Sequence, residues 1–378
     1  MRRFRKIIAL ILSLSFLLSL LTGCARTTNN GNTDNSSNQQ SDVGNETPSD
    51  GSGTRSVTLS DGYVVEGIPE NVERIAALFG PSYERLFVLG AEDKIVACSN
   101  SHRDSWPWSH LIYQHIDDED MVVIQNPNSG LNVEDLLEYD IDVCFYWSTA
   151  DVLKALENIG IAAVPYNTNS DVDSIKQELY AYAQVLGDDE SMAIYEKYAN
   201  YFDETLAEVQ AVTSQIPEEE RKVVHYGMRG LLSSVAADSN IAAVIEYAGG
   251  IPACTELAGT DSADIDKEQL ISWNPDAIFI DHTGDPQAEV DTVYSDSDYA
   301  NLPAVQNEEV YCVPTGVFYW DAGVQMILLI KWMAVTLYPE YFPDVDMVAE
   351  LQDFYQEFYR YDLTTEQAQA ILNCEDPS

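Results

Sequence analysis

The chain has 378 residues and a formal net charge of −44, from 19 Lys and Arg against 63 Asp and Glu. A single hydrophobic core rarely grows past roughly 250–300 residues, so we expect two lobes or domains. The hydrophobic content of 46% indicates a globular protein. The charge excludes the usual nucleic-acid binders, which need clustered Lys and Arg, and it disfavours attraction to anionic lipid.

Residues 1–23 have the features of a secretory signal. A basic stretch at 2–6 precedes an apolar run at 7–21, which is too short to span a membrane comfortably. The run ends in Leu21-Thr22-Gly23-Cys24, which resembles the lipobox of bacterial lipoproteins. We therefore expect removal of residues 1–23 and lipidation of Cys24; an ordinary signal peptide with an incidental cysteine is the alternative.

Residues 24–56 are predicted to be a disordered tether. Between 27 and 53 nearly every residue is Asn, Ser, Thr, Gly, Gln or Asp, and such a segment cannot bury apolar surface. A lipid anchor followed by a tether predicts a protein held at the outer, extracytoplasmic face of a bacterial cell membrane.

From residue 57 strands and helices alternate with short connections. This pattern predicts a parallel sheet covered by helices on both faces, and it assigns residues 57–187 to an N-terminal α/β lobe. The expected strands are 74–79, 94–98, 122–124, 141–146 and 162–165, and the expected helices are 80–89, 133–139, 152–159 and 173–186.

Residues 188–216 are predicted to form one long linking helix. Its apolar residues recur every three or four positions, and neither Gly nor Pro interrupts it before Pro217. At 1.5 Å per residue, such a helix is roughly 40 Å long.

The strand–helix pattern then restarts, which assigns residues 217–378 to a C-terminal α/β lobe with terminal helices. A single large doubly wound sheet is the alternative to two doubly wound lobes. The expected strands are 222–226, 276–280 and 310–313, and the expected helices are 241–248, 267–273, 323–337, 347–359 and 365–372.

Two stretches repeat between the halves. Leu131–Leu137 leads into Asp140–Phe145, and Ile265–Ile271 leads into Asn274–Phe279; each places an acidic residue at a helix start before a buried strand. Together with residues 74–90 and 248–250, they resemble the substrate-binding proteins of iron-siderophore, haem and cobalamin ABC importers. The resemblance covers about residues 72–340 and includes the uninterrupted linking helix.

The resemblance implies two α/β lobes joined by one rigid helix, with the ligand in a cleft between them. It implies a monomeric binding protein, not an enzyme, that serves an ABC permease and its ATPase. In that family one exposed glutamate on each lobe docks on permease arginines, and the matching residues are Glu134 and Glu268. The alternative is that both acids merely interact favourably with helix dipoles.

Ligands of open α/β sheets bind at the carboxyl ends of the strands. The loops at those ends are rich in aromatic residues, which suit a large, flat or partly apolar ligand. The ligand candidates are Phe79, Ser82, His102, Arg103, Trp106, Trp108, Tyr146 and Trp147 in the first half, and Tyr226, Met228, Arg229, His282, Phe318, Tyr319 and Trp320 in the second.

Each of these candidates has a structural alternative. Trp106 and Trp108 can pack on their own lobe, and Arg229 can pair with one of the many acids. The histidines show no metal-ligand spacing, so we assign no metal site. No metal-ligand spacing occurs among Cys98, Cys144, Cys254, Cys312 and Cys374. Their pairing stays open, and their odd number leaves at least one free thiol.

An iron complex is the expected cargo, with no resident cofactor. A ferric siderophore ranks first, a corrinoid such as cobalamin second, and haem third. A Zn or Mn binding protein and a surface sensor are the rivals from other classes. An anionic complex needs Arg103 or Arg229 in the cleft; otherwise a neutral or cationic complex is favoured.

Overall fold

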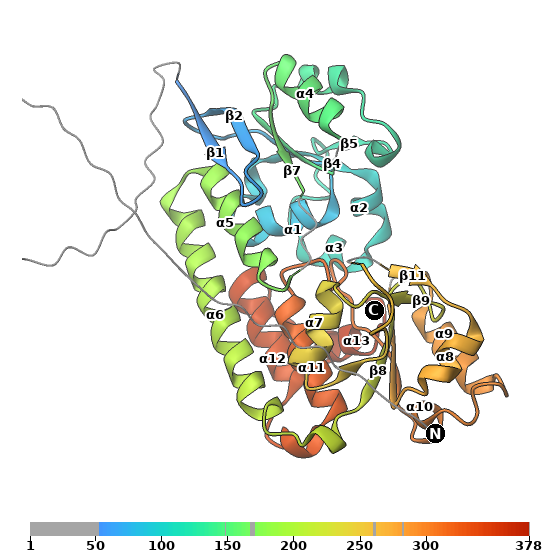
Figure 1. Ribbon diagram of the computed structural model, residues 1–378. Helices are drawn as coiled ribbons and strands as arrows, with labels where there is room; N and C mark the ends of the chain where they lie inside the picture. Colours follow the sequence, from blue (N-terminus) through green and yellow to red (C-terminus); the bar gives the residue numbers. More distant parts are fainter. Residues whose placement is uncertain (1–52, 148, 167–170, 260–261, 282, 378) are drawn as a thin grey trace, which may run out of the picture. The chain divides into compact units, whose positions relative to one another are not determined.

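Five short strands in the first half form a sheet that is parallel throughout, as the strand–helix alternation predicts (Figure 1). The order is β5-β4-β3-β6-β7, so the earliest of these strands lies at the centre. The strands are β3 (Ile75–Ala77), β4 (Ile95–Ser99), β5 (Val122–Ile124), β6 (Val143–Tyr146) and β7 (Ala162–Pro165).

The computed structural model describes residues 53–147, 149–166, 171–259, 262–281 and 283–377. The predicted signal, the lipidation site Cys24 and most of the tether lie outside these residues, as does His282. In the described part of the chain, no helix has both the length and the apolar character that a membrane span requires.

Helices follow the strands of the first lobe, but three features differ from the prediction. Residues 133–139 form a 3₁₀ helix, and two short helices after β4 were not expected, because six residues are too few for a helical pattern to show. The helices are α1 (Gly80–Val88), α2 (Asn100–Ser105), α3 (Pro107–Ile112), η3 (Val133–Tyr139), α4 (Ala150–Asn158) and α5 (Ser174–Leu186).

An antiparallel hairpin of β1 (Thr54–Thr58) and β2 (Val64–Pro69) precedes the first sheet. It begins inside the segment expected to be a tether. The reason is a long-range contact: Arg55 donates from Nη1 to the carbonyl of Gln184 at 2.7 Å and also bonds the carbonyl of Val185. The end of α5 thus orders residues that would be featureless by composition alone.

The linking helix is confirmed as α6 (Asp189–Thr213). Asp188 caps it by accepting a hydrogen bond from the backbone N–H of Ser191 at 2.8 Å. Tyr198, Phe202 and Val209 are buried on one side, and α6 packs against α5 of the first lobe and against α7 and α11 of the second (Figure 1).

The second lobe has a separate sheet of six strands, so the single-sheet alternative is wrong. Its order is β11-β9-β8-β12-β13, with β10 paired to β8; β9 and β11 run antiparallel and were not predicted. The strands are β8 (Val223–Gly227), β9 (Ser233–Val235), β10 (Ile251–Pro252), β11 (Ser262–Asp264), β12 (Ala277–Ile280) and β13 (Val310–Cys312).

Most helices of the second lobe lie where the sequence predicts them. The helix expected at 323–337 begins only at Met326. Gly323 lies against Glu84, where an added Cβ would be 2.5 Å from the carboxylate. The helices are α7 (Asn240–Tyr247), α8 (Lys267–Trp273), α9 (Pro286–Ser295), α10 (Pro303–Gln306), α11 (Met326–Leu337), α12 (Met347–Phe354), the π-helical turn η6 (Tyr355–Tyr359) and α13 (Thr365–Leu372).

A disulfide joins Cys312 at the end of β13 to Cys374, just after α13. It fixes the C-terminal helix to the second sheet. The other three cysteines in the described residues, Cys98, Cys144 and Cys254, are buried free thiols.

Residues 314–325, which connect β13 to α11, contact the first lobe directly. The buried carboxylate of Glu84 on α1 accepts hydrogen bonds from the Val324 N–H at 3.1 Å and from the Tyr359 hydroxyl. The Tyr198 hydroxyl on α6 donates to the carbonyl of Val324 at 2.8 Å. We call this segment the 314–325 loop; it joins the lobes in addition to α6.

Candidate functional site

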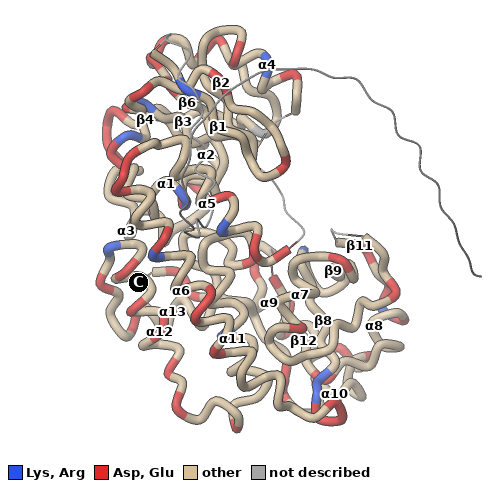
Figure 2. The backbone as a smooth tube through the Cα atoms, turned by 60° about the vertical axis from the view of Figure 1, so that its left-hand side comes forward, with Lys and Arg blue, Asp and Glu red and all other residues tan. Residues whose placement is uncertain are grey.

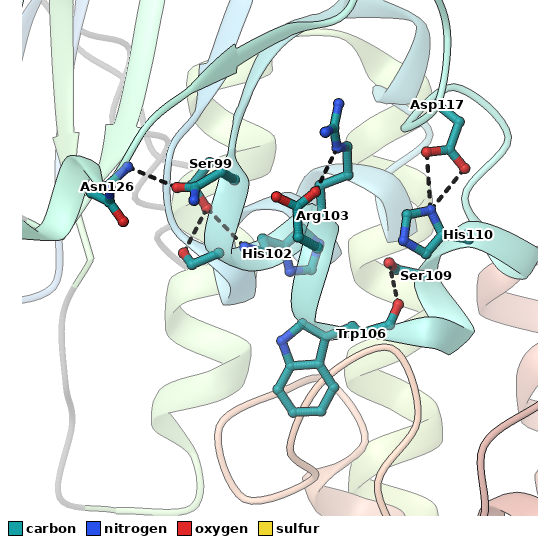
Figure 3. Close-up of polar contacts among 11 residues, drawn as sticks. Ser99, His102, Arg103, Trp106, Ser109, His110, Asp117 and Asn126 are labelled. Atoms are coloured by element: carbon teal, nitrogen blue, oxygen red, sulfur yellow. Dashed lines mark hydrogen bonds and ion pairs between the residues drawn. The ribbon is translucent and has the colours of Figure 1, made fainter. Parts of the chain in front are cut away.

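An aromatic cluster forms where the 314–325 loop meets helices α2 and α3. The Trp106 ring lies 4.9 Å from Phe318 and 4.6 Å from Tyr319, measured between ring centroids. Figure 3 shows Trp106 pointing from the junction of α2 and α3 toward this loop. Three predicted ligand candidates from opposite lobes are therefore in contact.

His102 lies beneath this cluster and is 2% exposed. Its backbone N–H bonds the Ser99 hydroxyl, but neither ring nitrogen has a hydrogen-bond partner among the described residues (Figure 3). Gly80 makes the close packing possible, since a Cβ there would lie 2.6 Å from Phe318 and 3.0 Å from His102 Nδ1. Burial, and then the charge of His110, lower the pKa of His102 to about 3, so its ring is neutral at physiological pH.

A second aromatic group stands at the carboxyl edge of the first sheet. Phe79, Trp147 and Tyr166 follow β3, β6 and β7, and their ring centroids are 4.8–5.6 Å apart. Trp147 is 46% exposed. Tyr166 was not among the predicted residues, although it follows a strand just as Trp147 does. We call these three residues the aromatic trio.

The aromatic trio is supported from below by a buried ion pair. Arg85 lies 5.2 Å from the Tyr166 ring centroid, and its Nη2 is 2.6 Å from Glu178 Oε2. Burial would lower the pKa of Arg85, but Glu178, together with Tyr166, Tyr182 and Glu84, outweighs burial and raises that pKa. Arg85 also donates to the carbonyl of Ala322 at 3.2 Å, which links the trio to the 314–325 loop.

The carboxyl edge of the second sheet is acidic. Asp281 follows β12 and accepts a 2.6 Å hydrogen bond from the buried Tyr226 hydroxyl. Burial raises the pKa of Tyr226, and the carboxylates of Asp281 and Asp321 raise it further. Burial is also the main cause that raises the pKa of Tyr319, and the same two carboxylates raise it further. Two buried carboxylates therefore lie behind this edge of the sheet.

Glu134 and Glu268 occupy equivalent places on the two lobes. Each is the second residue of its helix, η3 or α8, and each is exposed without a hydrogen bond or ion pair in the described part of the chain. The structure confirms the exposure that the sequence repeat predicts for both acids.

Comparison with known proteins identifies the family. Residues 75–315 match the family model described as periplasmic binding protein. The chain belongs to that family, of the iron, cobalamin and siderophore type. It is thus an extracytoplasmic solute-binding component of an ABC transporter, not an enzyme.

Three similar proteins illustrate the family. The molybdate-binding protein MolA of Haemophilus influenzae is 25% identical over 272 residues, which cover 64% of this chain and 73% of MolA. A periplasmic solute-binding protein of Veillonella parvula is 24% identical with a TM-score of 0.72, covering 85% of this chain and 97% of its own. Helicobacter pylori CeuE with Ni(II) bound is 19% identical with a TM-score of 0.68, covering 84% and 99%.

Several predicted ligand contacts of this binding protein lie inside the lobes, which corrects their assignment. Trp108 is buried and donates to the carbonyl of Glu375, and Trp320 is fully buried in the core. Their large apolar rings pack more favourably there than at a solvated edge. Ser82, Tyr146 and Tyr226 are also buried, with hydroxyls bonded to Tyr182, to the carbonyl of Pro127 and to Asp281.

Both predicted cationic contacts are engaged with neighbours. Arg103 Nε lies 3.0 Å from Asp104, and Arg229 Nη1 donates to the Ser262 hydroxyl at 2.7 Å. Arg229 is exposed and lines a pocket of about 560 Å³ on the second lobe. Met228, directly after β8, is half-buried.

The exposed histidines are paired with aspartates. His110 Nδ1 lies 2.8 Å from Asp117, and His115 Nδ1 lies 2.8 Å from Asp118. The described ranges contain no group of three His, Cys, Asp or Glu side chains placed to hold a metal ion.

His102→Leu is expected to stabilise the ligand-free protein by about 1 kcal/mol, because it removes two buried polar atoms without partners. His225 is the control: it is equally buried and its Nδ1 also has no partner among the described residues, but its Nε2 bonds the carbonyl of Leu231 at 2.7 Å. His225→Leu should destabilise, because it leaves that buried carbonyl without this bond. Urea unfolding at pH 7 measures both free energies.

The gain from His102→Leu should grow as the pH falls below 6.5. The pKa of His102 is depressed in the folded protein, so unfolding binds protons in that range and wild-type stability decreases. Equal destabilisation by His102→Leu and His225→Leu would contradict the assignment of unpartnered nitrogens.

Proposed function

We propose that this protein captures a siderophore-type ferric complex outside the cytoplasm and delivers it to an ABC permease while Cys24 anchors it by lipid. The aromatic trio, in which Trp147 is exposed and Phe79 and Tyr166 are half-buried, supports this proposal most directly. Three rings at one sheet edge offer apolar, polarisable contact area that suits a large, partly apolar chelate.

The charged residues near the predicted ligand edges indicate which net charge the ferric complex carries. Asp281 lies at the acidic edge of the second sheet with Asp321 nearby, whereas Arg103 and Arg229 already bond Asp104 and Ser262. Acidic residues also predominate along the described chain (Figure 2). We therefore infer a neutral or cationic ferric complex in preference to an anionic one.

Tryptophan fluorescence quenching tests the cargo. Ferrioxamine B is cationic, ferrichrome is neutral and ferric enterobactin is strongly anionic; cobalamin, haem and molybdate complete the series. We expect quenching by a cationic or neutral ferric complex, and about tenfold weaker binding for Trp147→Ala, which removes one aromatic contact. If the protein binds molybdate and none of the other compounds, the ferric chelate is excluded and the cargo is an oxyanion.

The cargo that co-purifies with the protein tests the proposal without a prior choice of ligand. Protein purified from cells that produce it naturally should carry iron by elemental analysis and show the visible absorption of a ferric chelate. A corrinoid or haem spectrum would point to another cargo within the same family. Mass spectrometry of the lipid-modified N-terminal peptide tests the anchor at Cys24.

A further inference from the structure

Glu134 and Glu268 each stand beside an exposed aliphatic side chain. Leu137, three residues after Glu134, is 51% exposed, and Ile271, three residues after Glu268, is 37% exposed. Residues i and i+3 lie on the same face of a 3₁₀ helix and are neighbours on an α-helix. The acid and the aliphatic residue therefore present one surface on each lobe.

The two surfaces belong to the same structural repeat. Leu136 on η3 and Leu270 on α8 are both fully buried, and each helix ends at a left-handed residue, Asp140 with φ 49° and Asn274 with φ 51°. The strands that follow, β6 and β12, both lie inside their sheets. The chain therefore places the exposed side chain at the same point of an equivalent helix–strand unit in both lobes.

Folding does not account for the exposed pair. The preceding leucines, Leu136 and Leu270, already fill the core beneath each helix. One exposed aliphatic residue is ordinary on a protein surface. Two at equivalent places, each next to an acid without a partner in the described residues, indicate a surface that is used twice in the same way.

We propose that Leu137 and Ile271 are apolar contacts of the permease docking surface, each beside its glutamate. This inference rests on the proposed delivery to an ABC permease. The fitting partner is a membrane protein that offers two sites, each with a basic residue next to an apolar depression. An arginine suits both needs, because its guanidinium can pair with the carboxylate while its methylene stem packs on the aliphatic side chain.

Charge favours this partner over a second copy of the chain. Self-association through either surface would bring Glu134 or Glu268 against another acid in a protein of net charge −44. Like charges in such an arrangement repel, whereas a basic partner gains both the charge pair and the apolar contact.

Photo-crosslinking tests the surface in the intact system. Benzoylphenylalanine is placed at position 137 or 271 of the full chain, in cells that produce the protein naturally. The controls are positions 64 and 294, because Val64 and Tyr294 are also exposed large side chains, one on each lobe. We expect both test positions, and neither control, to give an adduct whose peptides identify an ABC permease.

Uptake measurements test the same surface quantitatively, through the concentration of binding protein that gives half-maximal uptake. The double variant Leu137→Ser with Ile271→Ser should need at least about tenfold more binding protein for half-maximal uptake, because two apolar contacts are lost. Val64→Ser with Leu232→Ser, which changes one exposed aliphatic side chain on each lobe, is the matched control and should resemble wild type. Cargo affinity and melting temperature should be unchanged in the test variant.

Three results would overturn the inference. In the uptake measurement, it is wild-type uptake by the Leu137/Ile271 variant at every concentration of binding protein. In the crosslinking, it is adducts formed only with another copy of the chain, or adducts formed only at the control positions. If Glu134→Ala with Glu268→Ala also leaves uptake intact, delivery to the permease itself fails. If only the glutamate variant loses uptake, the proposed function stands and the apolar contacts are excluded.

Discussion

Uptake of the cargo is expected to be abolished by Glu134→Ala combined with Glu268→Ala, with cargo affinity unchanged. Both carboxylates are exposed and unpaired in the described residues, so each can accept an arginine of the permease. Truncating one partner of a charged interface pair costs about 2 kcal/mol or more. Two sites together correspond to at least about a thousandfold weaker docking.

Each single variant should retain intermediate uptake, because one lobe can still dock. Uptake is measured with a radiolabelled ferric complex in cells whose own copy is replaced, and cargo affinity is measured by fluorescence on the purified variants. Glu204→Ala with Glu208→Ala on α6 removes the same charge from an exposed helix face and should leave uptake at wild-type level. Full uptake by the Glu134/Glu268 variant would exclude the docking role.

The placement of Glu134 and Glu268 at equivalent, exposed helix starts was predictable because its signal is local. The repeated stretches predict an acid at a helix start and a buried strand that follows within a few residues, and the structure has both in each lobe. The linking helix was predictable for the same reason: periodicity and an N-terminal cap at Asp188 define it without reference to the rest of the chain.

The ligand candidates depend on contacts distant in sequence, and there the prediction was less accurate. Trp106 and Trp108 are two residues apart, yet one meets Phe318 of the other lobe and the other is buried against Glu375. No local pattern separates them. Tyr166 was overlooked, because the sequence does not show that β7 lies beside β6 and brings this ring to Trp147.

The antiparallel strands β9 and β11 also escaped prediction. Each has three residues, Ser233–Val235 and Ser262–Asp264, and neither alternates apolar and polar residues over a useful length. Their pairing depends on β8, which bonds β9 through Gly227 and Ser234. Strands of this kind are defined by the sheet that accepts them rather than by their own composition.

The contacts around α1 connect the first lobe to the 314–325 loop and to the aromatic trio. Glu84 accepts hydrogen bonds from the 314–325 loop and from Tyr359, while Arg85 reaches the carbonyl of Ala322 and supports the ring of Tyr166. A change at Arg85 would therefore affect both the fold and the aromatic trio. Among the described side chains, the Arg85–Glu178 pair is where we expect the largest stability effect.

Glu178→Leu is expected to lower the free energy of unfolding by about 3–5 kcal/mol. Arg85 and Glu178 are 2% and 7% exposed, with 2.6 Å between Nη2 and Oε2. Removing the carboxylate leaves a guanidinium in the interior without its closest counter-charge, and Arg cannot escape this cost by losing its proton. Urea or thermal unfolding of the purified protein measures the loss.

The double variant Arg85→Met with Glu178→Leu should recover much of that loss, because an apolar pair of similar size needs no compensating charge. The double-mutant cycle should therefore be strongly non-additive. Additive effects would show that solvent already screens the pair. Because Arg85 also supports Tyr166 and the 314–325 loop, we expect this folded double variant to bind cargo more weakly, which separates the stabilising role of the ion pair from its role in positioning the aromatic trio.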